Sequence, residues 1–171
     1  MGDDGFEQLI YDASRGQHEY LSHTADVKIH AWGDSLGYAF CAGAVGMFGY
    51  LTELDCVRVD AHIKPVVVHV HGHDAQSLLF SFLDECLFIF STELLVVRQI
   101  VLTDFRCADH EPDGQEGSQA FSVRAVLYGE KWDSKKHPAG CEIKAITFNE
   151  MEIYRTNGDT PAWHVEFVVD I

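Results

Sequence analysis

Hydrophobic residues recur at every second position in several stretches of the chain, which is the pattern of strands with one buried face. Val27, Ile29 and Ala31 alternate with more polar residues as far as Gly33, so we predict a strand there. Further strands are predicted near residues 57–61, 66–71, 94–103, 120–128, 141–154 and 163–171. The chain is therefore rich in strands, and most of them lie in its second half.

Two stretches show helical spacing of apolar residues instead. The first is residues 36–51, and either Asp34 or Ser35 can cap its N-terminus. The second begins after the capping residue Asp74 and covers residues 75 to about 90. Because this second segment is apolar on nearly every side, we expect it to be deeply buried.

The order of elements predicts an α+β fold: a single domain in which two α-helices pack on a mainly antiparallel or mixed β-sheet. A length of 171 residues suits one domain with a proper core. We place that domain at residues 18–171, because residues 1–17 are polar, acidic and aperiodic and are expected to form a flexible tail. Residues 107–118 are predicted to be a glycine-containing acidic loop.

The charge balance limits the partners that the protein can have. The formal net charge is −15, with only 12 Lys and Arg residues, so strong direct binding to nucleic acid is not expected. A metal ion or a basic protein surface is a better partner, although excess acid also serves solubility alone. No apolar run reaches the roughly 20 residues that cross a bilayer, so no membrane partner is expected. Five cysteines without paired spacing indicate reduced thiols, as in the cytoplasm or the nucleus.

Three carboxylates are candidates for one cation site. Asp26 directly precedes a predicted strand, and another predicted strand ends in Asp170 and Ile171, which adds the α-carboxylate. If these strands meet, the three groups converge, and oxygen ligands of this kind suit Ca²⁺ or Mg²⁺. The alternative is that Asp26 begins a strand and Asp170 is merely solvated. Spacing alone favours this alternative.

Histidines and basic residues form weaker candidates. His69, His71 and His73 would share one face of a strand close to His62, which could bind a transition metal, but a solvated edge strand is the better interpretation. The basic loop at residues 129–138 could contact phosphate, a nucleotide or an acidic partner, or could simply be solvated.

Two charged residues of the strand at 141–154 are also candidates. Glu142 and Lys144 share a face, where they could pair with each other or line a polar site beside the cation. The chain contains no nucleophile elbow, P-loop, dinucleotide fingerprint or zinc-protease motif, which makes catalysis less expected.

Several segments, taken in order, resemble the archease family. They are HTAD at 23–26, GDSL at 33–36, QSLL at 76–79, FLDE at 82–85, KHP at 136–138, EIKAIT at 142–147 and VDI at 169–171. The resemblance runs from about residue 19 to residue 171. The chain departs from the family pattern at Gly37 and Tyr38, where acids are common, and in the longer segment 107–118.

The resemblance implies a small α+β protein that is not itself an enzyme. Archeases assist the GTP-dependent RNA ligase of the tRNA-splicing ligase complex, which also acts in the unfolded protein response. They promote guanylylation of the ligase and allow it to turn over many times. The resemblance therefore implies this ligase as the partner and the cytoplasm, the nucleus or both as the location.

The resemblance also assigns residues to roles. It implies a divalent cation, Ca²⁺ first with Mg²⁺ or Mn²⁺ as alternatives, held by Asp26, Asp170 and Ile171. The expected partner-facing residues are His23, His137, Glu142 and Lys144. Two other functions stay open from the residues: a metal-dependent phosphoester hydrolase that uses the same carboxylates with His23, and a general chaperone-like binding module.

Overall fold

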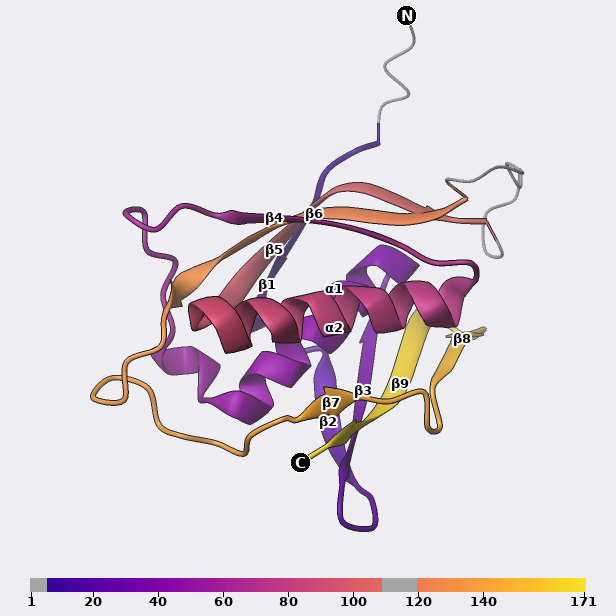
Figure 1. The fold of residues 1–171 in the computed structure, drawn as a ribbon. Coiled ribbons are helices and arrows are strands. Elements are labelled where there is room, and N and C mark those ends of the chain that lie inside the picture. The colour runs from indigo at the N-terminus through magenta and orange to yellow at the C-terminus, as the bar shows by residue number, and fades with distance from the viewer. Residues whose placement is uncertain (1–5, 109–119) are drawn as a thin grey trace, which may run out of the picture.

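Two α-helices lie between two antiparallel β-sheets in the computed structural model, which describes residues 6–108 and 120–171 (Figure 1). The predicted α+β class is confirmed. The strands, however, are divided between two sheets rather than gathered in one. Each helix contacts strands of both sheets, so the core lies between the layers.

The first sheet has the strand order β1–β5–β6–β4. Its strands are β1 (Leu9–Asp12), β5 (Leu95–Cys107), β6 (Phe121–Lys131) and β4 (Val66–His71). The two long strands β5 and β6 pair along their whole length, from Leu95 opposite Lys131 to Cys107 opposite Phe121. Most of the predicted loop at 107–118 lies outside the described residues.

The second sheet is built around β9. Its strands are β2 (His18–Ser22), β3 (Val27–Gly33), β9 (Ala162–Asp170), β7 (Ala145–Ile146) and β8 (Glu152–Thr156). β3 lies on one side of β9, and both β7 and β8 pair with its other side. The prediction of a single strand at residues 141–154 is therefore wrong. A turn between Phe148 and Met151 divides it into β7 and β8, because the Met151 N–H donates to the Phe148 carbonyl at 3.2 Å.

Each helix begins directly after a residue whose side chain caps its N-terminus. In α1 (Leu36–Leu51) the cap is Ser35, whose side chain accepts from the Tyr38 N–H, so Ser35 rather than Asp34 fills this role. In α2 (Ala75–Glu93) Asp74 and Ser77 form a reciprocal capping box. This helix ends three residues later than predicted, with Leu94 in the left-handed conformation.

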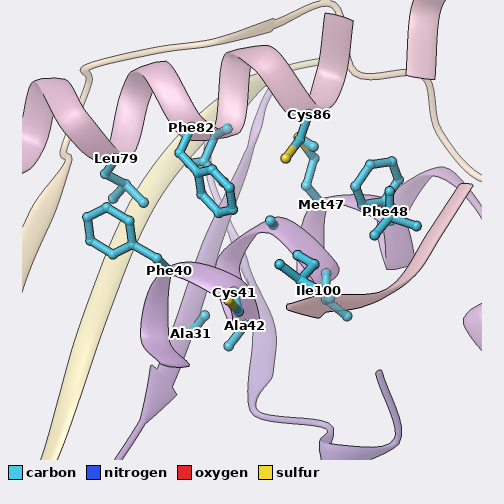
Figure 2. Packing of buried hydrophobic residues seen from close by; sticks show 14 of the residues in the cluster. Ala31, Phe40, Cys41, Ala42, Met47, Phe48, Leu79, Phe82, Cys86 and Ile100 are labelled. Atoms are coloured by element: carbon cyan, nitrogen blue, oxygen red, sulfur yellow. The ribbon is translucent and has the colours of Figure 1, made fainter. Parts of the chain in front are cut away.

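The core is formed by the facing surfaces of α1 and α2 and by the inner faces of both sheets. Figure 2 shows Leu79 and Phe82 of α2 pointing toward Phe40 of α1, and the Phe40 and Phe82 ring centroids are 6.4 Å apart. In the described part of the chain, α2 is long and apolar enough to cross a membrane, but half of its apolar window is buried against the rest of the molecule. The expected burial of this helix is confirmed for its inner side.

Two connecting regions differ from the prediction. Part of the expected flexible tail is regular structure: β1 pairs with β5, and the Tyr11 side chain is fully buried. Residues 1–5 lie outside the described range. The short strand expected at 57–61 does not form, and a 3₁₀ turn at Leu54–Cys56 stands before this segment instead. There the Arg58 N–H donates to a side-chain oxygen of Glu130 at 2.6 Å rather than to a neighbouring strand.

Candidate functional site

The pairing of β3 with β9 brings Asp26 and Asp170 to the same end of the second sheet. Val27 lies opposite Val169 in the last pair of this ladder, and Asp26 and Asp170 are the next residues on the two strands. Both valines are buried in the core, so the side chain of Asp170 points to the outer face of the sheet, where it is exposed. Two of the predicted carboxylate residues, 144 positions apart, are therefore neighbours at one sheet end.

The turn before Asp26 is held in an unusual backbone conformation. Ala25 has a φ of 64°, a backbone region that residues other than glycine rarely adopt. The Asp26 N–H points to the His23 carbonyl at 3.4 Å, and His23 Nδ1 lies 3.9 Å from Asp26 Oδ2. His23 Nδ1 is also buried without a hydrogen-bond partner. Strain and an unsatisfied polar atom together are typical of a functional turn rather than of a merely structural one.

Lys144 supplies positive charge to the end of β9. Its backbone N–H donates to the Asp170 carbonyl at 2.8 Å, and its side-chain Nζ donates to the backbone oxygen of Ile171 at 2.8 Å. Of the two alternatives for Lys144, a pair with Glu142 or a place beside the candidate cation site, its contact with Ile171 favours the second. Glu142 lines a separate hollow with Leu51, Phe90 and Trp132, and does not join the Asp26 end of the sheet.

Three charged residues that the sequence reasoning missed complete this region. Glu150 lies 3.5 Å from His23 Nε2 through one oxygen and 3.3 Å from Lys28 Nζ through the other. Lys28 also pairs with Glu166 at 2.7 Å, and this hydrogen bond raises the pKa of Lys28. Burial acts to raise the pKa of Glu166, but hydrogen bonds from Lys28 and Tyr154 outweigh it and leave the pKa lowered. Both partners are therefore charged at neutral pH.

The donor atoms at this end of the sheet fit a hard cation. Asp26 and Asp170 offer carboxylate oxygens and Ile171 a backbone oxygen, a set that suits Ca²⁺ or Mg²⁺ rather than zinc. Across residues 6–108 and 120–171, no three His, Cys, Asp or Glu side chains are grouped closely enough to hold a metal. A cation here would thus need the oxygens of Ile171 and water beside the two aspartates. The Lys144 ammonium already shows that the Ile171 oxygen is oriented toward a positive group.

His137, predicted to face a partner, is instead buried. Its side chain is completely inaccessible, whereas an exposed position was expected for a residue of the basic loop. The Asp133 N–H donates to Nδ1 at 2.9 Å, so Nε2 carries the proton and donates to Glu130 at 3.1 Å. Burial acts to raise the pKa of Glu130, but hydrogen bonds from Lys136, His137 and the Arg58 N–H lower it. This group fixes the loop that joins β6 to β7 and does not join the Asp26 end.

His69 and His71 lie on an edge strand, as the preferred interpretation of a solvated edge strand predicted. β4 is the last strand of the first sheet, and both side chains are exposed. Their ring centroids are 4.5 Å apart, and His69 Nδ1 lies 3.4 Å from the Arg124 guanidinium. A neighbouring cation disfavours metal binding at this position.

Comparison with known proteins gives one consistent family. The model of the Archease protein family matches residues 18–171. A protein from Drosophila melanogaster named Protein archease-like is 42% identical over 91% of this chain and 90% of its own length. Protein archease from Pyrococcus furiosus is 35% identical over 91% of this chain and 99% of its own length. The solution structure of Methanobacterium thermoautotrophicum protein 1598 superposes with a TM-score of 0.68 at 27% identity, covering 91% of this chain and 99% of that one.

Proposed function

Because the chain belongs to the archease family, we propose that it is a non-catalytic protein cofactor of the GTP-dependent RNA ligase that joins tRNA exons. It promotes guanylylation of the ligase and enables multiple turnover of an enzyme that acts on 3′-phosphate RNA ends. The observation that carries the proposal is the family match over residues 18–171. The same proposal places the protein with the tRNA-splicing ligase complex, in the cytoplasm, the nucleus or both.

We propose further that Asp26, Asp170 and Ile171 hold a divalent cation, Ca²⁺ first, with Mg²⁺ or Mn²⁺ as alternatives. A bound cation supplies concentrated positive charge among carboxylates that otherwise repel one another. Support comes from the β3–β9 register and from the oxygen-only donor set. Pairing of Val27 with Val169 brings the turn at Ala25 beside the end of β9, where the Asp170 side chain lies on the outer face of the sheet.

A multiple-turnover ligation assay tests the function directly. Ligase is supplied well below the concentration of RNA exon halves with a 3′-phosphate and a 5′-hydroxyl, together with GTP, and joined product is followed with and without this protein. We expect about one product per ligase alone and many with the protein added. A single round of joining in both reactions would refute the proposed function.

Two control reactions separate the alternatives. The protein alone is incubated with phosphomonoester and phosphodiester substrates, where metal-dependent turnover would favour a hydrolase. It is also added to an unrelated aggregation-prone enzyme, where protection would favour a general chaperone-like module. We expect neither effect, because the proposed activity needs the ligase as its partner.

A further inference from the structure

The turn between β7 and β8 exposes a large aromatic side chain. Phe148 is 54% exposed and stacks on Phe80 of α2, with ring centroids 4.3 Å apart and ring planes 6° from parallel. Two turns farther along α2 from Phe80, Phe88 is 59% exposed. Because residues four apart share a helix face, Phe80, Asp84 and Phe88 lie along one side of α2. We call Phe80, Phe88 and Phe148 the aromatic surface.

Hydrogen bonds hold Phe148 in a fixed position. The Thr147 N–H donates to the Val168 carbonyl at 3.2 Å, and the Asn149 N–H donates to Thr147 Oγ1 at 3.2 Å. On the helix side, Gln76 Nε2 donates to the Met151 carbonyl at 2.8 Å. An exposed aromatic ring on a fixed backbone loses little conformational entropy when a partner covers it, which is the property of a binding hot spot.

The same turn reaches the candidate cation site. Glu150 has a φ of 48°, rare for a residue with a side chain, and its carboxylate contacts His23 and Lys28. One short turn thus directs Phe148 onto α2 and Glu150 toward the Asp26 end of the second sheet. A partner that covers the aromatic surface would also lie beside that end.

Charge selects the kind of partner. Asp84 is exposed between Phe80 and Phe88 on the same side of α2, and the whole chain carries a net charge of −15. A second copy of the chain, an anionic membrane and a nucleic acid would all be repelled at close range. A protein surface with lysines or arginines around an apolar pocket would be attracted by the carboxylates and would bury the rings.

We propose that the aromatic surface is the docking site for a basic protein surface containing an apolar pocket, and that this surface belongs to the ligase subunit. The proposal rests on the proposed function for the identity of the partner. Phe148 is the central anchor, Phe80 supports its ring from below, and Asp84 forms the charged rim. The docking site holds the partner while the Asp26 end remains free to act.

The decisive variant is Phe148→Ser, with Val67→Ser as its matched control. Val67 is 63% exposed and lies on β4 in the other sheet, so Val67→Ser also replaces an exposed apolar side chain, but on a different face. Binding to purified ligase catalytic subunit is measured by calorimetry. We expect the Kd to rise at least tenfold for Phe148→Ser and to stay within twofold for Val67→Ser. Ca²⁺ affinity and thermal midpoint serve as checks that Phe148→Ser is folded.

A second variant, Asp84→Lys, tests the charged rim without removing any packing. We expect a severalfold slower association that becomes less sensitive to salt. Wild-type affinity in both Phe148→Ser and Asp84→Lys would overturn the docking site but leave the proposed function intact, since turnover by the wild-type protein decides that question separately. Dimerisation of the wild-type protein that Phe148→Ser abolishes would also overturn it. Absence of both binding and stimulation by the wild-type protein would overturn the two proposals together.

Discussion

His30 Nε2 lies 2.9 Å from His164 Nδ1 on the outer face of the second sheet. The ring centroids are 5.2 Å apart and the planes differ by 17°, so the two imidazoles lie end to end with their nitrogens directed at each other. His30 Nδ1 is 2.7 Å from a Glu19 oxygen, and His164 Nε2 is 3.2 Å from Thr156 Oγ1. With Glu19 ionised, His30 Nδ1 donates to it, and neutral His30 Nε2 then accepts from His164 Nδ1. This geometry suits one shared proton rather than a metal, which needs both lone pairs to converge on a third point.

We predict that this pair makes folding weaker in mild acid. Burial first, and then the neighbouring His30, lower the pKa of His164, against the opposing effect of Glu166. The folded protein therefore binds this proton less readily than the unfolded chain does. Its contribution is fully present above the ordinary histidine pKa and is lost as the pH falls through the lowered value. A second proton would also set two N–H groups against each other and break the pair.

The measurement is the free energy of unfolding by urea at pH 7.5 and pH 5.5. His164→Asn keeps a donor near His30 Nε2 but removes the titration, so we expect its stability to change less between the two pH values than that of the wild type. His73→Asn is the control, because the His73 side chain is 87% exposed. Lys28 and Tyr154, which also face this pair, stay unchanged in all three proteins. An identical pH response in the wild type and His164→Asn would contradict the prediction.

A second prediction concerns the candidate cation site. Asp26→Asn and Asp170→Asn keep the shape of each side chain but remove one negative oxygen ligand. We expect each to weaken Ca²⁺ binding at least tenfold and to abolish stimulation of the ligase, while the thermal midpoint without metal stays nearly constant. Asp34→Asn is the control, since its side chain is 80% exposed and lies at the other end of β3. Unchanged Ca²⁺ affinity in both variants, measured by calorimetry, would reject these residues as ligands.

The sequence alone was enough to predict the strand that follows Asp26 and the strand that carries Asp170, because both alternate clearly. It could not determine that these strands pair, since periodicity describes one strand and not its neighbour. The choice between a shared site and two unrelated acids depended on that register. Family resemblance favoured the shared site, and the Val27–Val169 pair agrees with it.

Other positions were hidden from sequence reasoning for physical reasons. His137 lies among lysines in a loop that looks solvated, but the Asp133 N–H and the side chain of Glu130 on β6 satisfy both of its ring nitrogens and make its burial favourable. Glu150 was placed in a continuous strand, although Asn149 beside it favours a turn. Tyr11 is buried by a four-residue strand too short to show a convincing period.

A third prediction follows from the contact between Lys144 and Ile171. Because the Lys144 ammonium lies 2.8 Å from the Ile171 oxygen, it repels any cation that shares this oxygen. We expect Lys144→Met to bind Ca²⁺ a few times more tightly, in line with about 1 kcal/mol for charges a few ångströms apart in water. Lys135→Met, also exposed but in the loop after β6, is the control for the change in net charge. Weaker Ca²⁺ binding by Lys144→Met would mean that Lys144 orders the site rather than competing with the cation.

The buried group around Glu130 gives the last prediction. Glu130 accepts hydrogen bonds from Lys136 at 2.6 Å, from His137 at 3.1 Å and from the Arg58 N–H at 2.6 Å. Glu130→Gln keeps an acceptor for the three donors at Oε1, but it removes the charge and turns an amide N–H toward the Lys136 ammonium at the Oε2 position. We expect a loss of about 2 kcal/mol in the free energy of unfolding, because partners at a largely buried site are left unsatisfied. Glu142→Gln is the control in the same region, and its exposed side chain should change stability by no more than about 0.5 kcal/mol.

Hydrogen exchange locates the effect of Glu130→Gln. The His137 and Gly140 amides donate to the Asp133 and Leu51 carbonyls at 2.7 and 2.9 Å, so they report whether the loop after β6 stays closed. We expect faster exchange at these amides in Glu130→Gln, with little change at the buried strand β3, which lies in the other sheet. Ligase stimulation should persist at temperatures where the variant remains folded, because His137 and Glu130 do not reach the Asp26 end. Loss of stimulation in a fully folded Glu130→Gln protein would instead assign this loop a direct part in partner contact.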